Sequence, residues 1–151
     1  MESSIFRLLK DLLYKANTES IMKQIRNMND PNVLHCFAAN YNWDNGFDIP
    51  TAILENENCD LGTGLLMFYY SDGYYLLEKS EDFFCFQSDE WKTFILTLRN
   101  KIINLDFNNQ DISFDPELTK IQMFKLRKTN PNIPDVLIHI SKGRKIDIPK
   151  I

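Results

Sequence analysis

The sequence has few of the residues that mark loop-rich, fibrous or disulfide-stabilised proteins. Only five glycines and six prolines occur among 151 residues, which argues against a fibrous or loop-rich chain. The three cysteines, Cys36, Cys59 and Cys85, are odd in number and form no C-x-x-C pair. We therefore expect small buried thiols in a reducing compartment, and neither disulfides nor a zinc site.

Long apolar runs are also missing. Glu2, Arg7 and Lys10 interrupt the N-terminal stretch, which excludes the continuous apolar core of a signal peptide there. No run approaches the length of about 18 apolar residues that a membrane-spanning helix needs. These absences predict a soluble, cytoplasmic protein that does not bind membranes.

Motifs for catalysis, metals and cofactors are not found. Neither glycine-rich phosphate loop, G-x-x-x-x-G-K or G-x-G-x-x-G, occurs in the sequence. The two histidines, His35 and His139, are far apart and lack the spacing of paired metal ligands. We expect His35 to be a structural residue on a helix and His139 to be exposed. The sequence thus predicts a non-catalytic protein without cofactor or metal.

Apolar material, by contrast, is sufficient for a packed core. Hydrophobic residues make up 44% of the chain and aromatic residues 13%, which is typical of globular proteins. A chain of this length is the usual size of one domain, and no segment reads as a linker. We therefore predict a single compact multi-helix domain, mainly α, over residues 1–151.

Capping residues and apolar spacing predict where the first helices begin. Ser3 or Ser4, then Asn17 or Thr18, and then Asp30 with Pro31 are helix-start signals ahead of apolar residues at helical spacing. The third of these helices should end near Asn45 and Gly46, because glycine accepts a left-handed backbone.

Further start signals follow along the chain. They are Asp48 with Pro50, Asp60, Ser88 ahead of the clearest apolar pattern (Trp91, Phe94, Ile95, Leu98, Ile102), and Asp115 with Pro116. The stretch V-L-I-H-I around His139 favours a short strand, and Lys142-Gly143 a turn. The C-terminus should then form either a small β-hairpin or an extended tail.

One segment resembles a family of bacterial proteins known as domain of unknown function 4274. The resemblance rests on H-C-F-A-A-N-Y-N-W-D-N-G-F-D-I-P-T-A-I from His35 and on C-D-L-G-T-G-L-L-M-F-Y-Y from Cys59. Later stretches, Y-S-D-G-Y-Y-L-L-E and L-T-K-I-Q-M-F-K-L-R-K-T-N-P-N-I-P, resemble longer members. Gly64 stands where the family pattern leads us to expect alanine. The resemblance implies no established activity, although it is compatible with an immunity role.

The residues around Trp43 have two interpretations. In the structural one, Asn42 to Gly46 form a corner between helices, with Trp43 and Phe47 in the core and Asp44, Asp48 and Asp60 as helix caps. In the other, the same corner is a ligand site. The structural interpretation is favoured, because short polar side chains at helix ends commonly bond to nearby backbone groups.

Charge is distributed unevenly along the sequence. Between Asp30 and Glu90 there are twelve acidic residues and one basic residue, so the segment carries 1 − 12 = −11. From Leu118 to Ile151, eight basic and two acidic residues give 8 − 2 = +6. The overall acidity argues against nucleic-acid binding by the basic C-terminal part, because the acidic segment would repel phosphate.

The acidic segment predicts a basic protein partner. Complementary charge speeds association and fixes orientation, while buried aromatic side chains supply affinity. The leading hypothesis is an immunity or antitoxin-type protein that neutralises a basic toxin, for example one of the nuclease type, through an acidic face. The expected partner-binding residues are Trp43, Asp44, Asn45, Glu55, Glu57, Asp60, Glu81 and Asp82.

Two other classes remain open. An enzyme or ligand-binding domain acting on a small molecule would need Asp44, Asp60 and His35 to meet in one cleft. A structural or adaptor subunit would instead present a large exposed apolar patch and form obligate oligomers.

Overall fold

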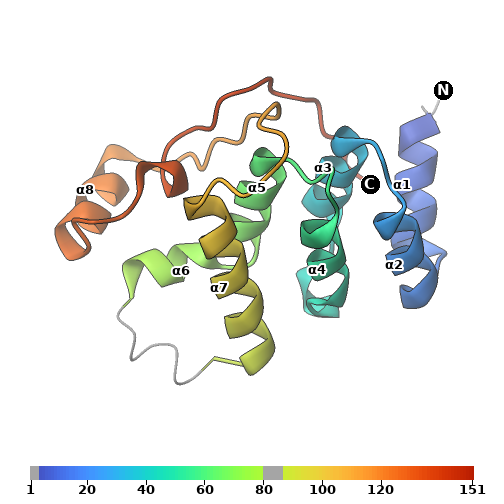
Figure 1. Ribbon diagram of the computed structural model, residues 1–151, viewed down its shortest axis with the longest axis horizontal. Helices are drawn as coiled ribbons and strands as arrows, with labels where there is room; N and C mark the ends of the chain where they lie inside the picture. Colours follow the sequence, from blue (N-terminus) through green and yellow to red (C-terminus); the bar gives the residue numbers. More distant parts are fainter. Residues whose placement is uncertain (1–3, 80–86) are drawn as a thin grey trace.

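The computed structural model describes residues 4–79 and 87–151. Eight α-helices and two short 3-10 helices provide the regular structure of these two ranges, which contain only isolated β-bridges and no strand. The prediction of a mainly α fold is confirmed. Figure 1 shows α1 to α4 side by side in one half of the view, α5 and α7 in the middle, and α8 at the opposite end.

The first three helices begin where their capping residues predict. They are α1 (Ser4–Tyr14), α2 (Thr18–Arg26) and α3 (Pro31–Asn40). Asn17 accepts a hydrogen bond from the backbone N–H of Ser20, and Asp30 accepts one from that of Asn32. α3 packs against α1, α4 and α5, and α2 packs against α4.

α3 ends earlier than predicted. Its last residue is Asn40, and the predicted stop at Asn45-Gly46 instead closes a separate 3-10 helix, η1 (Trp43–Asn45). The backbone of Tyr41 is already extended, and its hydroxyl donates to the carbonyl of Gly46 at 2.8 Å. The chain therefore turns between α3 and α4 (Asp48–Glu55) within a few residues.

Two of the three predicted aspartate caps in this region are wrong. Asn42, and not Asp44, caps η1 by accepting from the backbone N–H of Asp44. Asp48 is the first residue of α4, whose N-cap is Phe47 and has no side-chain hydrogen bond. Asp60 does cap α5 (Leu61–Tyr70), as predicted.

The central helices build most of the remaining core. α5 packs against α3, α6 (Gly73–Glu78) and α7 (Asp89–Ile103). Ser88 caps α7 by accepting from the backbone N–H of Trp91, at the predicted start of that helix. All five apolar residues predicted to form its inner face are buried (Trp91, Phe94, Ile95, Leu98, Ile102).

The predicted helix start at Asp115-Pro116 is wrong. Asp115 accepts from the backbone N–H of Glu117, and Glu117 has a φ of +55°, a left-handed conformation that a helix cannot contain. α8 (Lys120–Thr129) begins only after Thr119, which forms a reciprocal capping box with Gln122.

The predicted C-terminal strand is also wrong. Asp135–Leu137 form a 3-10 helix, η3, and the backbone N–H groups of Ile138 and His139 both donate to the Asp135 carbonyl. The carbonyl of Leu137 accepts from the hydroxyl of Tyr69 at 2.6 Å, so this turn is held against α5. His139 is exposed, as predicted.

An extended tail, the second of the two predicted C-terminal forms, follows η3. The tail crosses from the α8 end of the molecule back to α3 and α1 (Figure 1). The Asn40 side chain holds its end, because its amide donates to the Pro149 carbonyl and its oxygen accepts from the Ile151 N–H. No helix in the described residues is long and apolar enough to cross a membrane.

Candidate functional site

A cleft of about 730 Å³ lies between the N-terminal half of α7 and the whole length of α4. We call it the acidic cleft. Residues of η1 and of the turn that follows complete one wall. The residues that line it are Asn45, Gly46, Phe47, Asp48, Thr51, Leu54, Glu55, Asp89, Glu90, Thr93, Phe94 and Thr97.

Aromatic rings supply the apolar part of the lining. The rings of Phe47 and Phe94 lie 5.3 Å apart between centroids, which joins the start of α4 to α7. Trp43 packs behind both, at 6.3 Å from Phe47 and 5.8 Å from Phe94. Rings at these separations attract one another beyond simple area burial, so the lining is held in place by its own packing.

The corner before α4 positions Phe47 at the cleft. Gly46 has a φ of +95°, a conformation that other residues rarely adopt, and no atom would contact a Cβ there. Its conformation, and not a lack of space, therefore requires glycine. Asn42 fixes the preceding 3-10 turn, and Tyr41 bonds to the Gly46 carbonyl. The motif thus serves as the structural corner that its composition favours, and this corner forms a wall of the cleft.

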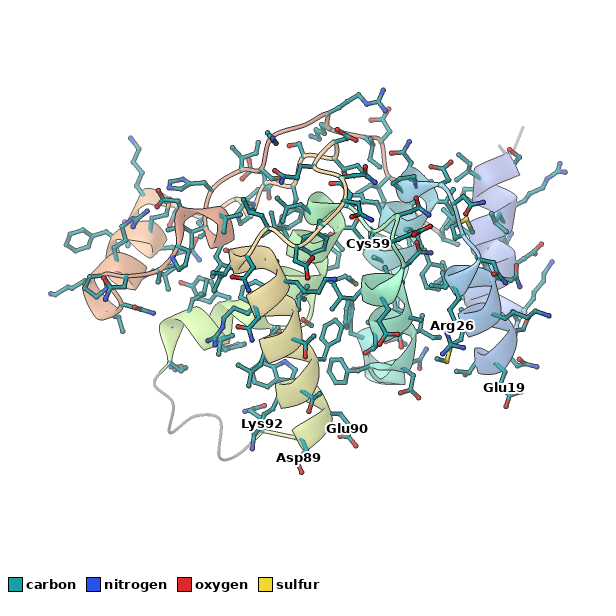
Figure 2. All side chains as sticks on the ribbon, in the orientation of Figure 1. Glu19, Arg26, Cys59, Asp89, Glu90 and Lys92 are labelled. Atoms are coloured by element: carbon teal, nitrogen blue, oxygen red, sulfur yellow. The ribbon has the colours of Figure 1, made fainter. Side chains whose placement is uncertain are left out.

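Four carboxylates surround the aromatic lining. Asp48 and Glu55 come from the two ends of α4, and Asp89 and Glu90 from the first turn of α7. None of the described residues that line the cleft is basic. Lys92 approaches Asp89 at 3.9 Å, but it extends from the other side of α7, whereas Glu90 lies on the side toward α4 (Figure 2). The cleft is therefore a region of negative potential with an apolar interior.

The position of Glu55 is unfavourable for its own helix. It is the last residue of α4, where the helix dipole presents partial negative charge, and its side chain is exposed. An acid at this end costs about 0.3–1 kcal/mol relative to a neutral residue. Departures from local preference of this kind are expected at functional sites.

The indole N–H of Trp43 is a second departure. Its nitrogen is buried and has no hydrogen-bond acceptor within the part of the chain that the structure describes. An unpaired buried donor costs about 1–3 kcal/mol. Trp91 offers a contrast, because its indole N–H donates to the Ser71 carbonyl at 2.7 Å. The unpaired donor adjoins the acidic cleft through the contacts of Trp43 with Phe47 and Phe94.

The predicted partner-binding residues have different surroundings. Asn45 and Glu55 line the acidic cleft, and Trp43 supports its aromatic lining. Asp44 and Glu57 are exposed but do not line the cleft. Glu81 and Asp82 lie outside the described residues. The acidic segment therefore contributes some of its carboxylates to one cleft and presents others elsewhere.

Asp60 needs correcting as a partner-binding residue. It is 0% exposed, and its carboxylate accepts three backbone hydrogen bonds, from Gly62 at 2.8 Å, Asp111 at 2.7 Å and Ile112 at 3.1 Å. The side chain joins the start of α5 to the segment that follows α7. Gly62 permits this approach, because a Cβ there would lie 2.0 Å from the Ile112 carbonyl oxygen.

His35 is also internal. It is 2% exposed, and its Nδ1 lies 2.9 Å from the hydroxyl oxygen of Thr63, which links α3 to α5. Burial lowers the pKa of His35 to about 4, so the ring is neutral near pH 7. His35 and Asp60 are thus sealed within the fold while Asp44 is exposed, and the three do not line a shared cleft.

The glycine at position 64 also has a packing reason. A Cβ at Gly64 would lie 2.6 Å from the tip of the Phe107 ring. The glycine therefore makes room for Phe107, a residue of the loop after α7. Glycine at this position weakens the helix through its low helix propensity, but it also provides space for the Phe107 ring.

Sequence reasoning missed the contribution of α7 to the site. In the sequence, Asp89 and Glu90 end the acidic segment but are not among the expected binding residues, and Phe94 belongs to the apolar pattern of its helix. Their second role depends on α7 facing α4 across the cleft, which no local pattern encodes. Thr51, Thr93 and Thr97 were missed for the same reason.

Sites for metals or reactive thiols are not evident in the described ranges. No group of three or more His, Cys, Asp or Glu residues within residues 4–79 and 87–151 is placed to hold a metal ion. Cys36 and Cys59 are free and buried, as predicted, and burial raises the pKa of both thiols. Cys85 lies outside the described residues.

Comparison with known proteins gives one family. The family model described as "Domain of unknown function (DUF4274)" matches residues 29–103, from the residue before the α3 cap to the end of α7. No curated protein and no solved structure matches the chain. The matched range contains every residue that lines the acidic cleft.

Proposed function

The chain belongs to the DUF4274 family through residues 29–103, and we propose that it is a protein-binding protein whose acidic cleft receives a basic segment of a partner. The observation that carries the proposal is the cleft itself. Four carboxylates surround a lining formed by Phe47, Phe94 and Leu54, and no basic side chain among the described residues lines the cleft to neutralise them.

The chemistry of the cleft suits lysine and arginine. Both side chains bury an apolar stem and keep a charged end near water, so they match an apolar lining with a carboxylate rim. Arginine also stacks on aromatic faces and pairs with carboxylates through two parallel hydrogen bonds. Bringing a cation between Asp48, Glu55 and Glu90 would also relieve the repulsion among these like charges.

The concave shape favours a protruding partner segment, such as a basic loop or helix. An immunity-type protein that neutralises a basic toxin is the specific form of this proposal. A nuclease toxin, for example, carries positive surface for binding phosphate, and a basic element at the edge of that surface would fit the cleft. The protein would act by occupying the partner and would perform no chemistry of its own.

A pull-down with matched variants tests the proposal. Tagged wild-type protein is exposed to lysate of its native cells at low salt, and retained proteins are eluted with rising salt and identified. We expect one basic protein in stoichiometric amount, released by salt because screening weakens charge pairing. Combining Glu55→Gln with Glu90→Gln should abolish its retention.

Glu19→Gln is the control. Glu19 and Glu90 are both the second residue of their helices, so their replacement has the same local cost to the helix dipole. Glu19 is exposed on α2, away from the α7 end of the cleft (Figure 2). Retention of the same partner by the double cleft variant would contradict the proposal, as would the absence of any basic partner.

A second candidate is a site for a small cationic molecule. The cleft volume of about 730 Å³ lies within the range of about 300–1,000 Å³ that ligand pockets occupy. The small-molecule site would then be the acidic cleft, and not a cleft formed by Asp44, Asp60 and His35. A thermal-shift screen with organic cations separates the two candidates, because stabilisation that Glu55→Gln abolishes would favour the small ligand.

A further inference from the structure

One face of α8 combines basic and large apolar side chains in solvent. Lys120, Ile121, Phe124, Lys125 and Lys128 are all exposed and recur at helical spacing along one side of the helix. We call this set the α8 face. Ile121 is 68% exposed and Phe124 69%, which is far more than the core residues of the other helices.

The packing of α8 within the described residues leaves Ile121 and Phe124 exposed. Leu126 is the one buried residue of α8, and the helix packs against α6. Its start is fixed by the capping box of Thr119 and Gln122, and its end by the ion pair of Arg127 with Asp135 at 2.6 Å. Lys125 and Lys128 also line a hollow together with Tyr74 and Glu78 of α6. Among the described residues, Ile121 and Phe124 remain largely exposed on the side of the helix away from Leu126, and exposed apolar side chains rimmed by charge are typical of interaction surfaces.

We propose that the α8 face docks into the acidic cleft of a second copy of this chain. This inference rests on the proposed function, because α8 of a second copy would be one of the basic segments that bind in the cleft. Phe124 and Ile121 would contact the apolar lining mainly at Phe47, which is half-buried, because Phe94 and Leu54 are each only 4% exposed.

Charge supports the same pairing. Three lysines of the α8 face, Lys120, Lys125 and Lys128, would meet the four carboxylates of the cleft rim. Both surfaces thus carry apolar side chains at their centre, and their charges are opposite in sign, an arrangement that fixes orientation at protein interfaces.

The contact must form between molecules. α8 lies at one end of the molecule, whereas the acidic cleft opens between α7 and α4 (Figure 1). Two different surfaces then meet at each contact, so the association is head-to-tail and leads to rings or open chains. A copy in such an assembly has its cleft occupied, and a foreign basic partner must compete with α8 for it.

Sedimentation velocity of the full chain tests the inference. Wild-type protein should show a weight-average mass that rises with concentration above the monomer mass of 17.8 kDa. The rise should vanish as salt increases from about 0.1 to 1 M, over which the Debye length falls from about 10 to 3 Å. Phe124→Ser and Lys125→Glu should each abolish it, and circular dichroism establishes that both variants are folded.

Mixing two defective variants gives the decisive result. Lys125→Glu keeps an intact cleft, whereas Glu55→Gln with Glu90→Gln keeps an intact α8 face. Neither variant should associate alone, but an equimolar mixture should form dimers, because one intact surface of each kind remains. A mixture that stays monomeric would overturn the inference, even if the wild-type protein associates.

Two further outcomes separate this inference from the proposed function. Wild-type protein that stays monomeric at every concentration, while its cleft still retains a basic partner in the pull-down, would overturn self-docking alone. Binding of phosphatidylglycerol vesicles through Phe124 and Lys125, without self-association, would likewise overturn it and assign the α8 face to a lipid surface.

Discussion

The Asp60 carboxylate joins two distant segments at the scale of a single residue. We predict that Asp60→Ala destabilises the protein by about 2–5 kcal/mol, because the backbone N–H groups of Gly62, Asp111 and Ile112 lose their acceptor inside the fold. Chemical denaturation measures the change. Asp44→Ala is the comparison and should lie within about 0.5 kcal/mol of wild type, because Asp44 is exposed and caps no helix.

Burial of His35 makes stability depend on pH. The pKa of His35 is about 4 in the fold and 6.5 in the unfolded chain, so between these values the unfolded state binds more protons. Stability is therefore full above pH 6.5 and falls as the pH drops toward 4. The loss from this group approaches about 3 kcal/mol at the lower end.

A His35→Gln variant isolates this effect. Glutamine has no titratable group, so its unfolding free energy should vary less between pH 6.5 and 4.5 than that of the wild type. Urea denaturation at a series of pH values measures both. Parallel curves for the two proteins would show that His35 is already protonated in the fold or does not control this window.

At the scale of the helix, the negative charge of Glu55 at the C-terminus of α4 lowers the stability of the protein. We predict that Glu55→Gln raises the free energy of unfolding by about 0.3–1 kcal/mol, because it removes an unfavourable charge from the helix C-terminus. The same variant should bind the partner more weakly. Thermal unfolding and partner retention are measured together, and a loss of both stability and binding would indicate a structural role for Glu55.

The helices also differ in how far sequence predicts them. α2, α3 and α7 begin where Asn17, Asp30 and Ser88 predict, because a capping side chain and its helix are only two or three residues apart. α8 was misplaced because Asp115 bonds to Glu117 in a turn, and the left-handed backbone of Glu117 excludes a helix there. An aspartate side chain accepts a nearby backbone N–H in a helix cap and in a turn alike, so the residue type alone does not distinguish the two.

The η3 segment shows a different limit. V-L-I-H-I has the composition of a strand, but a strand needs a partner, and the stretch is held by a hydrogen bond from Tyr69 and by the Arg127–Asp135 pair instead. Both contacts join residues that lie apart in the sequence. Propensity alone could not show which contact would decide the local structure.

At the scale of the whole molecule, the family segment and its C-terminal extension form one interlocked structure. Asp60 holds residues 111 and 112, Tyr69 holds Leu137, and Asn40 holds the end of the tail. Each bond joins a residue within the matched range 29–103 to one beyond it. The sequence shows an acidic segment and a basic segment. Which of their residues form the acidic cleft and the α8 face depends on how the helices pack.

Half of the cleft could be anticipated and half could not. The motif around Trp43 and the acids near it indicated one wall, because they are close together in the sequence. The other wall, with Glu90 and Phe94, comes from a helix more than forty residues further on. Its two acids end the acidic segment that predicts a basic partner, but the sequence does not show that they face α4.

The affinity of the retained partner for matched variants tests the central claim most directly. Isothermal titration would compare wild-type protein with Glu90→Gln and with Glu19→Gln. We predict that Glu90→Gln weakens binding about tenfold or more, as expected when an interfacial charge pair worth about 1.5 kcal/mol or more is lost, and that Glu19→Gln leaves the Kd unchanged. Equal Kd values for all three proteins would contradict the assignment of the acidic cleft as the binding site.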